Sequence, residues 1–197
     1  MKLVVATKNR GKLDELTAML APLGIEIVRL SDLGIAFDVV EDAATFSGNA
    51  EKKARALHHA TGLGALGDDS GLEVDALGGA PGVFSARYAG EGHNDRANNE
   101  KLLRELASVP DEKRTAQFRC ALALVDEHGA LTQTEGSCEG QILHAPRGEN
   151  GFGYDPLFLV PKLGCTLAEL TLDEKNRISH RAQALHALAK VLLARQF

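Results

Sequence analysis

Two adjacent carboxylates stand out in the pentapeptide Gly67-Asp68-Asp69-Ser70-Gly71, which follows a short apolar run at residues 63–66. Adjacent aspartates repel each other, so a fold rarely places them beside an apolar segment unless a cation or hydrogen-bond donors offset the repulsion. The flanking glycines let the backbone approach a ligand closely. The pattern indicates a metal site at a strand end. A solvated turn is the alternative, because Asp, Ser and Gly are also the commonest turn residues.

A second polar segment, Thr7-Lys8-Asn9-Arg10-Gly11-Lys12, lies between a predicted strand and a predicted helix. Residues 2–6 form a β-branched apolar run, and Leu13, Leu16 and Leu20 recur at helical spacing. A helix N-terminus offers backbone N–H groups and a positive dipole end, which suit a phosphate. The segment is not a P-loop, because the spacing G-x-x-x-x-G-K-[ST] is absent. An ordinary turn with exposed cations is the alternative.

The rest of the chain alternates predicted strands with predicted helices. Strands are expected at residues 26–30, 72–76, 116–125, 131–138 and 157–160, and helices from Thr45 or Ser47 to 62, from Asn94 or Asp95 to 110, and from Ser179 onward. Residues 116–138 read as an antiparallel hairpin. This alternation predicts an α/β or α+β fold with a mixed sheet, and the length of 197 residues suits a single domain over residues 1–197.

Composition and charge exclude several classes of protein. Hydrophobic residues make up 44% of the chain and charged residues 25%, which is ordinary for a globular protein. The net charge of −5 argues against a nucleic-acid polymer as partner. Cys120, Cys138 and Cys165 are widely spaced, which favours reduced thiols in a cytoplasm over disulfides or a zinc site. No apolar run approaches 18 residues, so we expect neither a signal peptide nor a membrane span.

Polar side chains gather wherever one predicted element gives way to the next. Cations stand at Lys12, Lys53, Lys175 and Arg181, carboxylates at Glu41, Asp68, Asp69 and Asp155, and an aromatic-glycine loop at residues 152–154. Several cations offset the charge of a triphosphate, a pair of carboxylates holds Mg²⁺, and an aromatic face stacks on a base. The inventory therefore matches a nucleoside triphosphate with magnesium.

Over nearly its whole length the sequence resembles the inosine triphosphate pyrophosphatase-like family, which includes bacterial enzymes that hydrolyse dITP, ITP and XTP. The resemblance rests on Thr7-x-Asn9-x-x-Lys12, Glu41, Asn49-Ala50 with Lys53, Asp68-Asp69-Ser70-Gly71, Leu77-Gly78-Gly79-Ala80-Pro81-Gly82, Ser85-Ala86-Arg87-Tyr88, Phe152-Gly153-Tyr154-Asp155-Pro156, and Glu174-Lys175 before Ser179-His180-Arg181. Two departures are visible. Gly48 stands where many members have Glu, and Lys8 stands where many have a small residue.

The resemblance implies both a fold and a site. The fold would be a mixed central sheet flanked by helices, with two lobes, the active site in the cleft between them, and a homodimer as the assembly. Glu41 and Asp69 would hold Mg²⁺, and Asp69 would also accept the proton. The implied substrate contacts are Thr7, Lys8, Asn9, Arg10, Gly11, Lys12, Lys53, Ser70, Phe152, Gly153, Tyr154, Asp155, Lys175, His180 and Arg181.

The implied activity is hydrolysis of dITP, ITP and XTP to the monophosphate and pyrophosphate, which removes these nucleotides from the pool. Water attacks the α-phosphorus, and charge neutralisation with positioning supplies most of the catalysis. Arg181 and a donor nitrogen of His180 would favour a purine with a six-oxo group over adenine. Two alternatives stay open: a pyrophosphatase for pyrimidine or modified nucleotides, and a non-catalytic nucleotide-binding protein.

Overall fold

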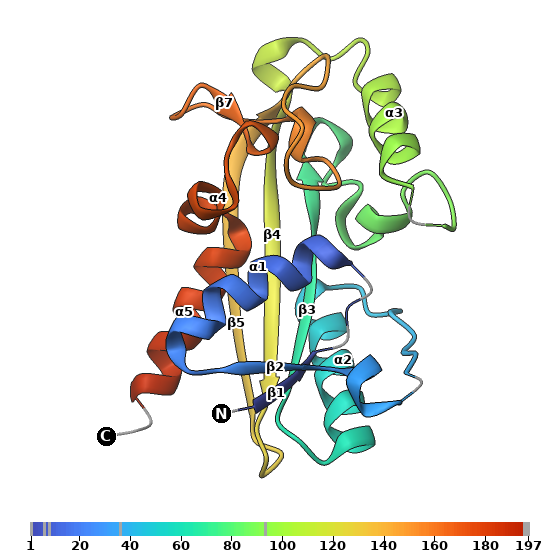
Figure 1. Ribbon diagram of the computed structural model, residues 1–197. Coiled ribbons are helices and arrows are strands. Elements are labelled where there is room, and N and C mark those ends of the chain that lie inside the picture. Colours follow the sequence, from blue (N-terminus) through green and yellow to red (C-terminus); the bar gives the residue numbers. More distant parts are fainter. Residues whose placement is uncertain (1, 6, 8, 36, 93, 195–197) are drawn as a thin grey trace. The chain divides into compact units, whose positions relative to one another are not determined.

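A seven-stranded mixed sheet forms the centre of the computed structural model, which describes residues 2–5, 7, 9–35, 37–92 and 94–194 (Figure 1). The strand order is β2-β1-β3-β4-β5-β6-β7. Strand β1 pairs in parallel with β2 and β3, whereas β6 pairs in antiparallel orientation with β5 and β7. The expected mixed sheet with helices is therefore confirmed.

The elements follow the predicted order closely. The strands are β1 (Lys2–Val5), β2 (Glu26–Arg29), β3 (Ala65–Val74), β4 (Thr115–Val125), β5 (Leu131–Ile142), β6 (Phe158–Val160) and β7 (Cys165–Thr166). The α-helices are α1 (Arg10–Leu20), α2 (Phe46–Thr61), α3 (Asp95–Glu105), α4 (Leu172–Ile178) and α5 (His180–Ala194). The short strand β7 escaped prediction because two residues carry no periodic signal.

Side-chain caps fix the starts of three of the predicted helices, α1, α2 and α3. Asn9, Thr45 and Asn94 each accept a hydrogen bond from a backbone N–H in the first turn of α1, α2 and α3 respectively. Each cap satisfies a donor that has no partner inside its helix. The predicted helix boundaries near these residues are therefore confirmed.

The chain divides into two compact units, as the two-lobed expectation required. The first unit comprises Met1–Asp69, Cys120–Gly136 and Arg181–Phe197, and the second comprises Ser70–Arg119 and Ser137–His180.

Helices cover both faces of the sheet in the first unit. Leu3 and Val5 point to one face, where they share a core with leucines of α1 and α5. Val4 points to the opposite face and packs with Ala65 and with Leu57 of α2. This alternation is the two-residue period of a strand, and burial on both faces explains the unbroken apolar run of β1.

A separate core fills the second unit. Leu72 and Val74 of β3 pack with Leu102 of α3, and the rings of Phe118 and Phe158 lie 4.7 Å apart between centroids. The core therefore joins β3, β4, β6 and α3, and it supports the loops that connect them.

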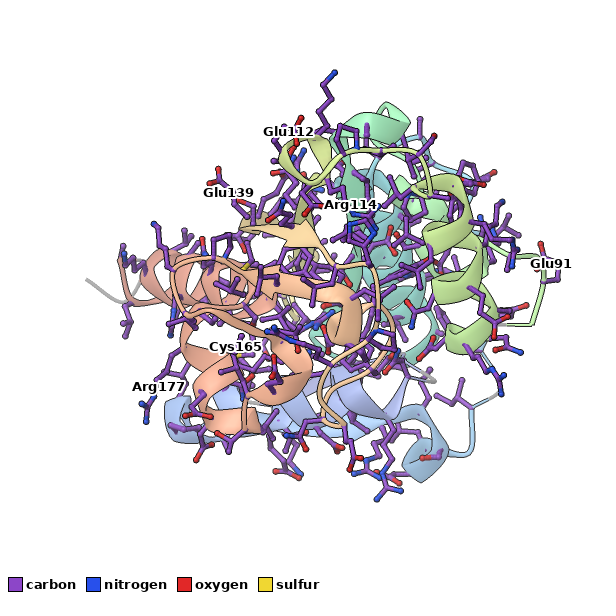
Figure 2. All side chains as sticks on the ribbon, turned by 90° about the horizontal axis from the view of Figure 1, so that it is seen from above. Glu91, Glu112, Arg114, Glu139, Cys165 and Arg177 are labelled. Carbon is purple, nitrogen blue, oxygen red and sulfur yellow. The ribbon has the colours of Figure 1, made fainter. Side chains whose placement is uncertain are left out.

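A buried guanidinium links the loops of the second unit. Arg114 is 1% exposed and donates hydrogen bonds to the carbonyl oxygens of Leu106, Ile142 and Leu143. Figure 2 shows it among the ribbons, whereas Arg177 projects outward. Three carbonyl acceptors offset the cost of burying this group, because each replaces a hydrogen bond to water. We assign Arg114 a structural role.

The aspartate pair does not lie at a strand end, and the sequence prediction was wrong on this point. One continuous strand, β3, replaces the predicted break between the apolar run and a second strand at 72–76. Gly67, Asp68, Asp69 and Gly71 are all buried inside it. The solvated-turn alternative is excluded with it.

Two further findings bear on the sequence expectations. Cys120, Cys138 and Cys165 are free thiols, as expected. No described helix is long and apolar enough to cross a membrane.

Gly67 gives the first testable prediction, because it lets β3 approach α2. A Cβ atom at this position would lie 2.0 Å from the backbone oxygen of Ala50, which cannot rotate away. We expect Gly67→Ala to lower the free energy of unfolding by about 1–3 kcal/mol or more, measured by denaturant titration. Gly64→Ala is the matched control, since its Cβ would meet the flexible Leu3 side chain at 3.1 Å. Equal losses in the two variants would contradict the close-approach explanation.

Candidate active site

Asp68 and Asp69 point to opposite faces of β3, because successive side chains of a strand alternate. Asp68 faces α1 and α5, where it meets Lys12 and Arg181. Asp69 faces α2, where it meets Lys53. Asp68 and Asp69 therefore form ion pairs with different cations on opposite faces of the strand.

Asp68 belongs to a buried cluster of charged groups in the first unit. Its Oδ1 lies 2.7 Å from Lys12 Nζ, and its Oδ2 lies 2.7 Å from Arg181 Nε. A terminal nitrogen of Arg181 also donates to Glu15, and Cys120 Sγ lies 3.5 Å from Asp68 Oδ2. The side chains of Arg181, Glu15 and Asp68 are at most 2% exposed. Two cations and two carboxylates balance each other away from water, as buried charges require.

The cluster keeps Asp68 ionised. Burial alone would raise its pKa, but the guanidinium of Arg181 and the ammonium of Lys12 outweigh that effect and hold the pKa of Asp68 well below its usual range. Burial raises the pKa of the Cys120 thiol well above its ordinary value, helped by the neighbouring Asp68 charge. Asp68 is thus a permanent anion and Cys120 a neutral thiol, and neither state suits proton transfer near neutral pH.

Asp69 has a different set of partners. Lys53 Nζ lies 3.0 Å from Asp69 Oδ1 and 2.8 Å from Glu41 Oε2, and it also donates to the Asp68 carbonyl oxygen at 3.1 Å. Asn49 donates from Nδ2 to Asp69 Oδ2 at 3.2 Å. Glu41, which is distant in sequence, therefore reaches the same ammonium as Asp69.

The pKa of Asp69 is shifted in the opposite direction to the pKa of Asp68. Burial raises the pKa of Asp69 above its ordinary value, and the Glu41 carboxylate adds to this, while Lys53 and Lys12 only partly oppose it. Burial would lower the pKa of Lys53, but Asp69 and Glu41 outweigh it and raise the pKa of that ammonium. A buried carboxylate whose pKa is raised in this way is a candidate general base.

The donor chemistry at Glu41 and Asp69 fits a hard divalent cation. Oxygens from both carboxylates lie within 3.0 Å of one nitrogen, so they already converge on a single positive charge. Among the described residues, no group of three or more His, Cys, Asp or Glu is arranged to hold a metal ion. Mg²⁺ commonly takes only one or two protein carboxylates and completes its shell with water and substrate phosphates. Two converging carboxylates meet that requirement.

The β1–α1 connection has the predicted geometry of a helix N-terminus. Thr7 Oγ1 accepts a hydrogen bond from the Asn9 backbone N–H at 3.1 Å, and Asn9 Oδ1 accepts one from the Lys12 backbone N–H at 3.1 Å. Arg10 and Gly11 form the first turn of α1. Lys8 lies outside the described residues. Asn9 therefore caps helix α1, and the ammonium of Lys12 forms an ion pair with Asp68.

The second unit contains the loop at residues 152–155 and Lys175. Asp155 accepts hydrogen bonds from the Lys175 ammonium and, at 2.9 Å, from the Phe152 backbone N–H. Lys175 Nζ also lies 4.6 Å from the centroid of the Phe152 ring. Lys175 is 3% exposed, and these two contacts join it to the aromatic loop.

Three other expected residues of this unit are placed separately. Tyr154 donates from its hydroxyl to the Ser85 carbonyl oxygen at 2.8 Å. The ring of His180 stacks on Phe118 with centroids 4.8 Å apart. Ser70 follows Asp69 in β3 and is partly exposed. Tyr154 and His180 are each 4% exposed, so both side chains belong to the buried part of the second unit.

Sequence reasoning missed three residues that complete these clusters. Asn49 donates a hydrogen bond to Asp69 and accepts one from the Ala43 backbone N–H. The Asn49-Ala50 motif contributed to the family resemblance, but no role was predicted for Asn49. Glu15 and Cys120 complete the Asp68 cluster. Glu15 carries a usable signal, since it lies three residues after Lys12 on α1 and so shares its face.

Comparisons with known proteins agree over almost the full length. The sequence pattern of the Ham1 family matches residues 3–191. A dITP/XTP pyrophosphatase of Desulforamulus reducens is 53% identical over 192 residues, covering 98% of this chain and 96% of the relative. One from Bacillus subtilis is 51% identical, covering 97% of this chain and 96% of the relative. The chain belongs to the Ham1 family. The resemblance drawn from the motifs is thereby confirmed.

A solved Ham1 structure supports the fold as well. The Staphylococcus aureus Ham1 protein is 40% identical in sequence and superposes with a TM-score of 0.87. The match covers 99% of this chain and 100% of the Staphylococcus aureus chain. The stretch that matches the Ham1 family contains every site residue expected from sequence.

The Asp68 cluster gives the second prediction. We expect Asp68→Asn to lower the free energy of unfolding by about 3–5 kcal/mol, because it removes a charge that buried Arg181 and Lys12 require. Chemical denaturation followed by circular dichroism measures this. Asp42→Asn is the matched control, since Asp42 pairs with Lys52 on the exposed surface and its loss should change stability little. A small effect at Asp68 would show that the cluster contributes no net stability.

Proposed function

We propose that this chain hydrolyses dITP, XTP and ITP to the nucleoside monophosphate and pyrophosphate, and so removes non-canonical purine nucleotides from the pool. The observation that carries the proposal is the convergence of Asp69 and Glu41 on Lys53, with the pKa of Asp69 raised. Membership of the Ham1 family and the names of its dITP/XTP pyrophosphatase relatives support the same activity.

Asp69 is the proposed proton acceptor. Its raised pKa makes it a stronger base than an ordinary aspartate, which suits a group that accepts a proton from the water attacking the α-phosphorus, and Asn49 donates a hydrogen bond to it. Glu41 and Asp69 would hold Mg²⁺, which when bound supplies charge neutralisation at phosphate oxygens and a more acidic water. Lys53 remains charged beside both carboxylates and so can also attract a phosphate oxygen.

The β1–α1 segment is the proposed phosphate-binding site. It contains Thr7, Asn9, Arg10, Gly11 and Lys12, with Lys8 expected there from sequence. The helix N-terminus and the ammonium of Lys12 favour an anion. Asp68 holds Lys12 through an ion pair of 2.7 Å, which limits the entropy lost when that side chain engages a phosphate.

The loop at residues 152–155, with Ser70, Lys175, His180 and Arg181, is the proposed substrate and base contact set. A donor beside the six-oxo group would favour hypoxanthine and xanthine over adenine by about 1–3 kcal/mol, because adenine would leave that donor without an acceptor. The guanidinium of Arg181 already binds Asp68 and Glu15. Arg181 therefore has a structural role. Its contact with the base remains a prediction.

We further propose that residues 1–197 act as one nucleotide pyrophosphatase domain, in the cytoplasm and as a homodimer. The three free thiols support a reducing compartment. The family resemblance supports the homodimer, which sedimentation of the purified chain can test.

A pyrophosphate-release assay over eight nucleotides tests the proposed function. We expect dITP, ITP and XTP to release pyrophosphate much faster than dATP, dGTP, dCTP, dTTP and a methylated purine nucleotide, with Mg²⁺ present. Chelation by EDTA should abolish release and added Mg²⁺ should restore it, because carboxylates are hard oxygen ligands. Preference for a pyrimidine or the methylated nucleotide would point to the other pyrophosphatase class, and binding without release would indicate a non-catalytic protein.

The role of Asp69 gives a separate prediction. Asp69→Asn keeps the side-chain volume but removes the base, so kcat for dITP should fall by about 10²–10⁴ while nucleotide affinity changes much less. Stopped assays give kcat and calorimetry gives the affinity. The same substitution at Asp75, an exposed residue just beyond β3, is the control and should leave both values unchanged. Normal turnover by Asp69→Asn would remove it from the mechanism.

A further inference from the structure

Helix α3 holds the peptide groups on both sides of Gly153. The Gly153 backbone N–H donates to Asp95 Oδ2 at 2.9 Å, and Asn99 Nδ2 donates to the Gly153 carbonyl oxygen at 2.9 Å. Asp95 and Asn99 are four residues apart on α3, so they lie on one face of the helix. Both backbone hydrogen-bonding groups of one glycine are therefore bound by side chains of one helix.

Gly153 is a position where such bonds have a large effect. Its φ of +60° lies in the left-handed region, and no atom of the described residues beyond its own chain neighbours lies within 4 Å of where its Cβ would be. Neither a side chain nor packing around one restrains this residue, and glycine has the widest backbone freedom of all residues. The two bonds from α3 are consequently a direct restraint on the loop conformation.

The neighbours of Gly153 are fixed by other parts of the second unit. On one side, the Phe152 backbone N–H binds Asp155, and the Phe152 ring lies against Lys175. On the other side, the Tyr154 hydroxyl binds the Ser85 carbonyl oxygen. Gly153 joins these two anchored side chains, so its conformation sets the direction of one relative to the other.

We propose that Asp95 and Asn99 are positioning residues for base recognition, which act by holding Gly153 and thereby the Phe152 ring. The inference rests on the proposed function, in which the loop at residues 152–155 contacts the base. Neither residue touches the substrate in this proposal. Their effect is to pre-organise the loop, which lowers the entropy lost on binding.

The chemistry of Asn99 makes the role testable by substitution. Only its amide nitrogen can donate to a carbonyl, so the Gly153 bond sets the orientation of the amide. Among the described residues, the Asn99 Oδ1 atom is buried without a hydrogen-bond partner. Asn99→Ala therefore deletes a buried unsatisfied acceptor together with the bond, which limits the loss of stability. Asn99→Asp instead places a carboxylate oxygen against the Gly153 carbonyl oxygen.

Asp95 offers a conservative substitution that should preserve function. Asp95→Asn keeps an oxygen that accepts the Gly153 N–H, whereas Asp95→Ala removes it. The neighbouring Asn98 of the same helix instead donates hydrogen bonds to the carbonyl oxygens of Ser85 and Ala86. Asn98 therefore anchors α3 and does not bind the loop at residues 152–155 through these bonds.

Steady-state kinetics with dITP and dATP at saturating Mg²⁺ test the inference. We expect Asn99→Ala to raise KM for dITP about tenfold with kcat within about twofold, and to lower the dITP to dATP ratio of kcat/KM, since loop order is lost while the proton acceptor is untouched. Asn99→Asp should raise KM further. Asp95→Ala should resemble Asn99→Ala, and Asp95→Asn should resemble the wild type.

The control is Asn94→Ala, which removes the cap of the same helix but neither bond to Gly153. It should lower the melting temperature while leaving KM and the selectivity ratio unchanged. Equal KM shifts in Asn94→Ala and Asn99→Ala, or no shift in Asn99→Ala, would overturn the positioning role while leaving the proposed function standing. A wild-type chain that releases no pyrophosphate from dITP would overturn the proposed function and this inference with it.

Discussion

The alternation of β3 is the constraint on which the charged groups of the first unit depend. Successive side chains of a strand leave opposite faces, so two adjacent aspartates enter two separate environments. Asp68 meets Arg181 and Lys12, while Asp69 meets Lys53. A one-residue shift in the pairing of β3 would exchange the two carboxylates. The observed register pairs Val4 of β1 with Ala65 of β3, and Val5 with Leu66.

The two environments shift the pKa values of two chemically identical residues in opposite directions. Asp68 lies among two cations and a second carboxylate, so its charge is permanent and it holds structure together. Asp69 is also buried but has weaker compensation, and the nearby Glu41 carboxylate makes it more basic. Pairs of carboxylates whose surroundings push their pKa values apart are a general way to separate an anchor from a base.

The second unit contributes restraint rather than acid–base chemistry. In its loop at residues 152–155, side chains of Asp95, Asn99 and Asp155 form hydrogen bonds to backbone groups. Arg114 likewise donates hydrogen bonds to the carbonyl oxygens of Leu106 and Leu143. Side-chain bonds to backbone groups therefore take the place of regular secondary structure where the chain must present a loop.

Local sequence patterns by themselves determined the starts of α1, α2 and α3 and the approximate positions of most strands, because caps and periodicity act over a few residues. The same patterns, combined in order, determined the family. They failed at the aspartate pair, where turn-forming residues lie inside a strand. Only the tertiary structure decided which carboxylate meets which cation, and it brought in Glu15, Asn49 and Asn99. These assignments depend on contacts between segments up to 166 residues apart, which no local pattern can encode.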